Sequence, residues 1–187
     1  VPGAGDNVVI PDVVATTSVT FSSGTTSINS LTAGDVLILN GGTLDVAASS
    51  SSTNSLSLNG GTLTGTGDLV VSGDFSFGAN SQMTGAGTTT IAAGTTWSWN
   101  CSSGGNNLAR TLVNNGTGIR VGGFGCQISS PGVLRNMGGA TFDLQADTQF
   151  SGSGTIENQS GAMFVKSSGA GTCRIDPVLT NDGTVHV

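Results

Sequence analysis

The chain has 187 residues, a length typical of one domain with a single hydrophobic core. Five Lys and Arg stand against eleven Asp and Glu, a net charge of −6, so the chain lacks the basic surface that nucleic-acid binding requires. Glycine accounts for 31 residues and hydrophobic residues for 36%, which excludes a disordered chain and favours β-structure with many turns. No apolar run approaches the roughly 18 residues of a membrane helix, so we expect no membrane insertion.

The first part of the chain contains three short apolar runs separated by Pro, Gly and Ser. These runs are residues 7–10, 19–21 and 28–31. We expect residues 1–36 to form the opening coil or coils and the cap that covers the first exposed edge of the fold. More regular coils are expected over residues 37–187.

From residue 37 onward, pairs of apolar residues at positions i and i+2 recur every 19 to 23 residues. Alternate residues of a strand point to the same face, so each pair predicts a strand with one buried face. The repeat places these side chains, including both tryptophans, in a shared interior. The pairs are Leu37/Leu39, Leu56/Leu58, Phe75/Phe77, Trp97/Trp99, Ile119/Val121 and Phe142/Leu144, followed less regularly by Phe164 and Val185/Val187.

Two further columns repeat in step with the first. In one, an apolar residue precedes a Gly, Ser or Pro turn, at Leu63, Met83, Ile128, Phe150 and Cys173. In the other, an Asn follows an apolar residue by two positions, at Asn114, Asn136, Asn158 and Asn181. Stacked Asn side chains can hydrogen-bond along the axis of the coils, and Asn tolerates the left-handed conformation of turns. We therefore predict an asparagine ladder.

Three columns in register predict an all-β fold, a single-stranded right-handed parallel β-helix (β-solenoid) of about eight coils that spans residues 1–187 as one domain. A helical fold is disfavoured because the apolar positions follow a period of two in short bursts. A β-sandwich would not keep three columns in register. The right-handed sense follows from the general preference of parallel crossovers.

Two of the three cysteines are spaced by one coil. Cys101 and Cys126 lie 25 residues apart, and adjacent coils are about 4.8 Å apart, so we predict a disulfide between them. Cys173 lies in an inward column and is expected to be a small buried hydrophobic residue.

The beginning of the chain carries a series of short motifs. They read Gly5-Asp-Asn-Val-Val-Ile-Pro11, Ser27-Ile-Asn-Ser-Leu31, and two copies of a Leu-x-Leu-x-Gly-Gly-Thr-Leu segment at residues 37–44 and 56–63. This series resembles the starts of right-handed β-helix domains in secreted bacterial adhesins and multidomain surface proteins. The resemblance implies the architecture and a bacterial, secreted or cell-surface location.

Both ends of the sequence suggest a piece of a larger protein. The chain starts at Val1 and stops at Val187 within an alternating pattern. We expect both ends to be trimmed, the first by removal of a signal peptide, and neighbouring domains to be covalently linked to this one.

Catalytic chemistry is not expected. His186 is the only histidine and lies at the end of the chain, so a Ser/His/Asp or Cys/His triad could form only around that end. The Asp residues are scattered, and the Gly-Gly-x-Gly-x-Asp repeat of calcium-binding solenoids is absent. We expect no metal, no cofactor and no enzyme activity.

The predicted outward positions supply the candidate binding residues. Arg120 and Asp143 would face outward on neighbouring coils, either as a surface ion pair or as contacts to a ligand. Phe124, in a loop of glycines, is either an exposed aromatic or an anchor that folds back over the coil. Trp99 would join the site only if its side chain proved to be exposed, because its column places it in the core.

The resulting functional prediction is a non-catalytic polysaccharide-binding module, for example for xylan-type glycans, in a secreted modular enzyme. It rests on the long polar faces that solenoid coils present, and in outline it resembles the β-helix carbohydrate-binding modules found beside glycoside hydrolases. A structural or adhesive segment of a bacterial surface protein is the alternative. A small polysaccharide lyase or hydrolase comes third, because no cluster of carboxylates is apparent.

Overall fold

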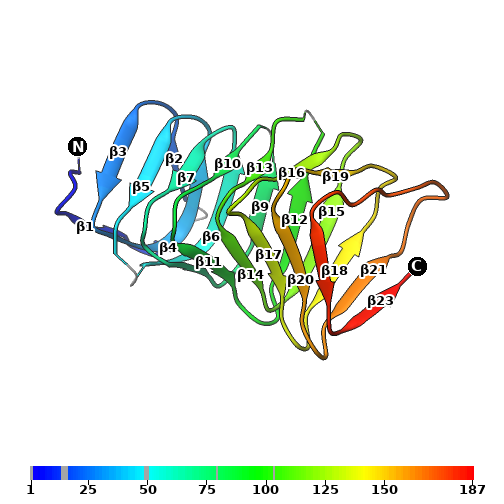
Figure 1. Cartoon of the computed structure of the whole chain (residues 1–187). Helices are drawn as coiled ribbons and strands as arrows, with labels where there is room; N and C mark the ends of the chain where they lie inside the picture. The colour runs from blue at the N-terminus through cyan, green and yellow to red at the C-terminus, as the bar shows by residue number, and fades with distance from the viewer. Residues whose placement is uncertain (1, 14–16, 49–50, 79, 103) are drawn as a thin grey trace.

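The computed structural model describes residues 2–13, 17–48, 51–78, 80–102 and 104–187. The described chain folds into an elongated stack of coils, with the two termini at opposite ends (Figure 1). It contains 23 strands and no helix, so no described segment forms a helix that could cross a membrane. All strand pairs are parallel and lie in sheets of 16 and seven strands, which confirms a parallel β-solenoid of about eight coils.

Each coil consists of up to three strands, and we number the faces of the solenoid in that order. The first face contains β1 (Asn7–Ile10), the first halves of β4 (Ser30–Leu39) and β6 (Ser51–Asn59), then β8 (Leu69–Val71), β11 (Thr88–Ile91), β14 (Thr111–Asn114), β17 (Val133–Asn136), β20 (Thr155–Asn158) and β22 (Val178–Asn181).

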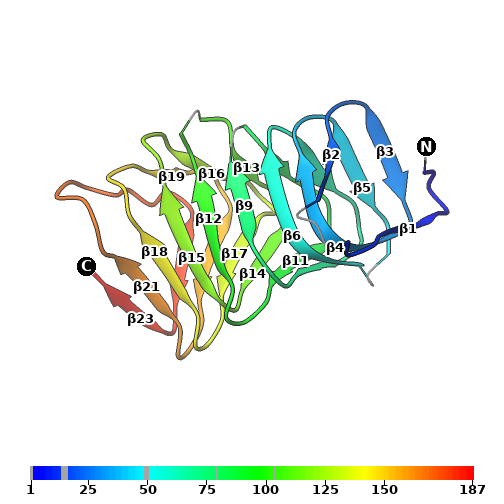
Figure 2. The same cartoon turned by 180° about the vertical axis from the view of Figure 1, so that it is seen from behind.

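The second face follows along the chain. It contains β2 (Ser18–Phe21), the second halves of β4 and β6, then β9 (Phe75–Gly78), β12 (Thr96–Asn100), β15 (Thr117–Val121), β18 (Thr141–Leu144), β21 (Met163–Lys166) and β23 (Thr184–His186) (Figure 2). The third face is a separate sheet of β3 (Thr25–Ile28), β5 (Thr43–Val46), β7 (Thr62–Thr64), β10 (Gln82–Met83), β13 (Asn107–Leu108), β16 (Cys126–Ile128) and β19 (Phe150–Ser151) (Figure 1).

The interior contains a continuous stack of aromatic rings, as the sequence repeat predicts. The centroid of the Trp97 ring system lies 5.6 Å from that of Phe75 on one side and 5.6 Å from that of Phe142 on the other. Trp99 packs on Phe77 at 5.0 Å and on Phe150 at 5.4 Å. Both tryptophans are therefore core residues. Their ring contacts stabilise the fold in addition to the burial of their apolar surface.

The predicted inward positions of β15 are wrong by one residue. Trp97 pairs with Gly118 and Trp99 with Arg120, so these two positions of β15 point inward while Ile119 points outward, as does Val121. The reason lies in the neighbouring coils. A Cβ atom at Gly118 would lie 2.6 Å from a Phe142 ring carbon and 2.7 Å from Trp97, so the two rings already fill this space.

The predicted column of apolar residues that precede a turn is also shifted in the last coils. Leu63, Met83, Leu108 and Ile128 share one register. Phe150, however, pairs with Cys126 and then with Ile175, so the predicted alignment of Phe150 with Ile128 and Cys173 is wrong. The Phe150 ring occupies interior space beside the rings of Trp99 and Phe142, at 5.4 and 6.2 Å. Cys173 is only half-buried, near the last coils, rather than a fully buried hydrophobic residue.

The asparagine ladder is present. The Nδ2 group of Asn114 donates to Oδ1 of Asn136 at 2.8 Å, and Asn136 donates in the same way to Asn158 at 2.9 Å. Asn158 continues the series to Asn181 at 2.7 Å, and the indole N–H of Trp97 donates to Oδ1 of Asn114 at 2.8 Å. The ladder therefore satisfies side-chain amides that are fully buried in its middle rungs, where an unpaired group would be costly.

Candidate functional site

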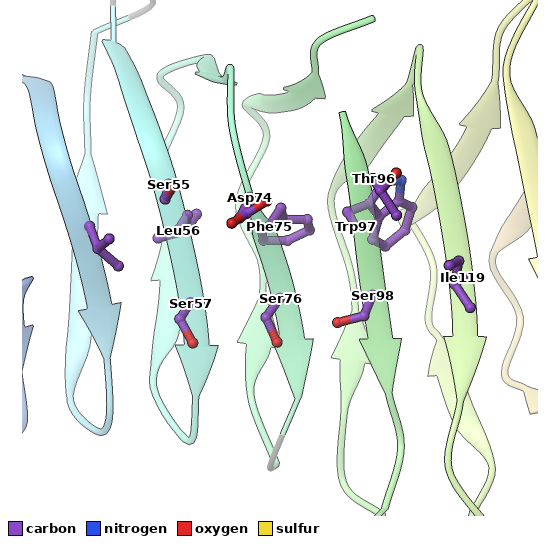
Figure 3. A pocket seen from close by; sticks show the side chains of 11 residues that line it. Ser55, Leu56, Ser57, Asp74, Phe75, Ser76, Thr96, Trp97, Ser98 and Ile119 are labelled. Carbon is purple, nitrogen blue, oxygen red and sulfur yellow. The ribbon is translucent and has the colours of Figure 1, made fainter. Parts of the chain in front are cut away.

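A groove of about 340 Å³ crosses the second face of the solenoid. It extends over β4, β6, β9, β12 and β15, so its long direction follows the axis of the coils (Figure 3). Adjacent strands are about 4.8 Å apart, which gives the groove a length of roughly 19 Å. The lining residues are Val36, Ser55, Leu56, Ser57, Asp74, Phe75, Ser76, Thr96, Trp97, Ser98 and Ile119.

The depth of the groove follows from side-chain size in one outward row. The pairing of the strands places Ile38, Ser57, Ser76, Ser98 and Ile119 at the same position on successive coils. The three central members are small, whereas both end members are large, so the surface is hollowed over the middle strands. The three serine side chains follow one another across β6, β9 and β12 (Figure 3).

The polar groups of the groove are free to bind a ligand. Within the described part of the chain, the hydroxyls of Ser57, Ser76 and Ser98 make no hydrogen bond to the protein, and neither does the carboxylate of Asp74. The backbone carbonyl of Asp74 accepts a hydrogen bond from the Leu56 N–H at 2.9 Å, so the residue is fixed while its side chain stays exposed. Hydroxyls both donate and accept, whereas a carboxylate accepts only.

Arg120 is not an outward residue, contrary to the sequence prediction. Its exposed fraction is 0%, because the register of β15 turns it into the interior beside Trp99. The guanidinium carbon lies 5.9 Å from the centroid of the Phe150 ring. Burial lowers the pKa of Arg120. A negative charge on the nearby Cys173 sulfur would act in the opposite direction and raise this pKa. A residue in this position cannot contact a polysaccharide on the surface.

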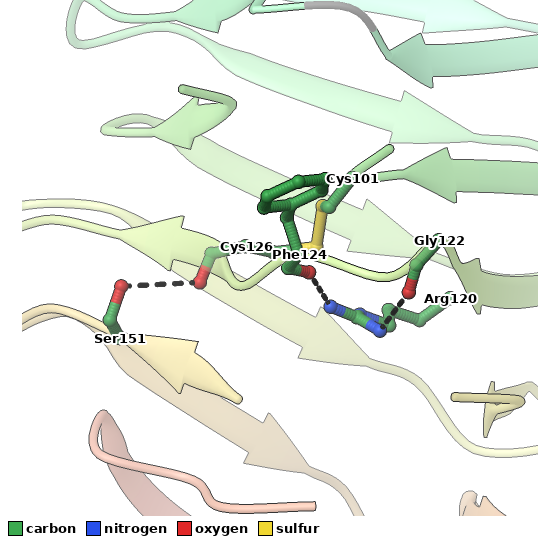
Figure 4. The surroundings of a disulfide bond; sticks show 6 residues. All are labelled: Cys101, Arg120, Gly122, Phe124, Cys126 and Ser151. Carbon is green, nitrogen blue, oxygen red and sulfur yellow. Dashed lines mark hydrogen bonds between the residues drawn. A yellow bond between two sulfur atoms is a disulfide. The ribbon is translucent and has the colours of Figure 1, made fainter. Parts of the chain in front are cut away.

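Arg120 instead organises the loop that follows β15 (Figure 4). Its Nη1 donates to the carbonyl oxygen of Gly122 at 3.0 Å, and its Nη2 donates to that of Phe124. A disulfide joins Cys101 and Cys126 with a Cα–Cα distance of 5.6 Å, and the Phe124 N–H donates to the Cys101 carbonyl at 2.9 Å. The loop thus holds Phe124 on the surface, where its side chain is 57% exposed.

The remaining candidates divide between surface and core. Asp143 faces outward, but its carboxylate accepts hydrogen bonds from Ser167 and Gln145, and its neighbour in the outward row is Ile119 rather than Arg120. The expected Arg120–Asp143 surface pair is therefore wrong. Trp99 is 0% exposed and belongs to the aromatic stack.

The three serines lie between the paired core residues of the sequence repeat, which implies outward positions, but the repeat alone did not identify them as a site. The available signal was the row itself, three small residues between two isoleucines at one position of the repeat. Asp74 gave no such signal, because single Asp residues before strands are common in turns.

Comparison with protein-family models, with curated proteins and with solved structures finds no match. Among the described residues, no group of three or more His, Cys, Asp or Glu side chains is placed to hold a metal ion.

Proposed function

We propose that the protein is a non-catalytic module that binds polysaccharide along the groove of the second face, within a secreted or cell-surface bacterial protein. The observation that carries this proposal is the groove itself, which is open, extends along the solenoid axis and combines unpaired hydroxyls with apolar side chains in its lining. A linear glycan of the xylan type presents hydroxyl groups at regular intervals and would lie along such a groove.

The composition of the groove favours binding over hydrolysis. Asp74 is the only carboxylate among the described lining residues, whereas glycoside hydrolysis normally uses a pair of Asp or Glu residues flanking the scissile bond. His186 belongs to β23, well outside the strands that line the groove. A bound glycan would therefore meet hydrogen-bonding groups without the acid and base that cleavage requires.

The test is affinity electrophoresis and calorimetry against xylans, mannans, glucans and pectins. We expect micromolar to millimolar binding to one class, with no oligosaccharide released. Ser76→Ile should weaken binding at least tenfold, because it fills the groove with a side chain that the same row already carries at Ile38 and Ile119.

Thr90→Ile is the matched control. Thr90 lies on β11 of the first face between Val70 and Val113, away from the groove, and this variant should bind like the parent. Equal binding by the Ser76 variant would reject the groove as the site. Silence across the whole panel would reject the proposal in favour of a structural or adhesive segment, and released oligosaccharides would indicate a hydrolase or lyase.

A further inference from the structure

The five Lys and Arg side chains of the chain all lie among the described residues, and none of them is left as a free surface cation. Arg110 and Arg120 are buried, at 2% and 0% exposure, and both donate to backbone carbonyls. Arg110 bonds to the carbonyl oxygens of Gly67 at 3.0 Å and Thr84 at 3.3 Å.

The other three cations are paired with carboxylates of the chain. Arg135 contacts Glu157 at 2.6 Å on the first face. Lys166 contacts Asp147 at 2.6 Å, and Arg174 pairs with Asp176, both near the last coils. A negatively charged ligand would therefore find no unpaired Lys or Arg on this protein, whose net charge is already −6.

The groove adds a local charge of the same sign. The Asp74 carboxylate is exposed in the groove, and the described lining residues include no Lys, Arg or His. A uronate or sulfate group entering the groove would be brought toward this carboxylate without any compensating cation, and like charges at short range repel. The hydroxyl groups of an uncharged sugar would instead donate charge-assisted hydrogen bonds to the carboxylate.

We propose that the ligand of the groove is an uncharged polysaccharide, and that Asp74 is the residue that selects it over polyuronates and sulfated glycans. This inference rests on the proposed function, since it concerns the same groove. Asp74 has two roles in it. It accepts hydroxyl hydrogen bonds from a neutral glycan, and it repels an anionic one.

The test uses probes that differ in charge but not in backbone. Xylan, mannan and β-glucan are each prepared as hydroxyethyl and carboxymethyl derivatives of equal substitution, and binding is measured by calorimetry. We expect the hydroxyethyl form of the recognised glycan to bind at least tenfold more tightly than its carboxymethyl form at low salt. The difference should shrink as ionic strength rises, because the repulsion is screened.

Asp74→Asn should reduce the discrimination to less than threefold and weaken binding of the neutral form several-fold. Asp45→Asn is the control, because it changes the net charge equally but lies on β5 of the third face, where its carboxylate accepts a hydrogen bond from Ser27 at 3.0 Å. It should leave the discrimination intact.

The outcomes separate the two proposals. Equal binding of both derivatives by the parent would overturn the selection of neutral glycans while leaving polysaccharide binding in place. Loss of discrimination in the Asp45 variant as well would overturn the role of Asp74 in favour of net charge. Binding of no derivative by any variant would overturn the proposed function itself.

Discussion

The buried guanidinium of Arg120 donates a hydrogen bond to the backbone carbonyl of Phe124, the one exposed Phe or Trp among the described residues. An interior cation thus fixes the conformation of a surface loop. Burial of an arginine is unfavourable unless its donors find acceptors, and here two loop carbonyls accept hydrogen bonds from Nη1 and Nη2, whereas the buried Nε has no partner. The loop and the interior of this coil therefore depend on each other.

We expect Arg120→Met to destabilise the protein by about 1–3 kcal/mol, because two carbonyls lose their donor while the apolar part of the side chain is preserved. Urea unfolding measures the change, and hydrogen exchange of residues 122–126 should accelerate. Arg135→Met is the control, since that half-exposed arginine forms a surface pair with Glu157 and its loss should change stability by less than about 1 kcal/mol. Unchanged stability and unchanged exchange in the Arg120 variant would contradict this role.

The asparagine ladder should be most sensitive at its centre. Asn136 accepts a hydrogen bond from Asn114 and donates one to Asn158, both buried, and it also donates to the Met163 carbonyl in a partly buried bond. Asn136→Ala leaves buried groups on both sides without partners, and we expect a loss of about 2–4 kcal/mol in the free energy of unfolding.

Asn181→Ala tests the exposed end of the same ladder. Asn181 is solvent-exposed, so water can replace the hydrogen bond that it accepts from Asn158, and we expect a loss below about 1 kcal/mol. Thermal and urea unfolding of both variants provide the comparison. Equal losses at the two positions would mean that burial does not determine the strength of the ladder.

The sequence was sufficient to predict the solenoid and the ladder, because each coil repeats the same local pattern. Asn114, Asn136 and Asn158 recur at one position with the same neighbours, so the pattern alone determines their stacking. The inward position of Arg120 could not be predicted in this way. It depends on the ring volumes of Trp97 and Phe142 in the adjacent coils, which leave room only for Gly118 between them.

The groove was difficult to predict for a related reason. Alternation places Ser57, Ser76 and Ser98 on the outward side, but depth is a property of the row and its neighbours taken together. The row became recognisable only when strand pairing aligned the serines between Ile38 and Ile119. Of the two alternatives for Phe124, the structure has the exposed side chain, and the contacts that hold its loop follow from the unexpected position of Arg120.

The three cysteines should differ in reactivity. With Cys101 and Cys126 joined, thiol titration under non-reducing conditions should detect one thiol per chain, and three after reduction in denaturant. Burial raises the pKa of the Cys173 thiol above its ordinary value of 9.0, which Arg120 and Lys166 partly oppose. At pH 8 its alkylation should therefore be slower in the folded protein than in urea, because less thiolate is present. Detection of three thiols before reduction would contradict the disulfide.

Asp147 should titrate at unusually low pH. The Lys166 ammonium donates to its carboxylate at 2.6 Å and the Gly171 N–H donates at 2.9 Å, and these bonds hold the pKa of Asp147 below its ordinary value of 3.8. The same ammonium also donates to the carbonyls of Ser168 and Gly169, so one cation holds the loop together.

A lowered pKa means that the folded state binds the Asp147 proton less readily than the unfolded state does. The stabilisation is therefore fully present above pH 3.8 and is lost as the pH falls through the lower folded-state pKa. NMR titration of the Asp147 carboxyl carbon measures this pKa directly. Lys166→Met should raise it toward 3.8, whereas Arg174→Met, which removes the partner of Asp176 instead, should leave it unchanged. If Asp147 titrated at its ordinary value in the parent protein, the loop would not depend on this ion pair.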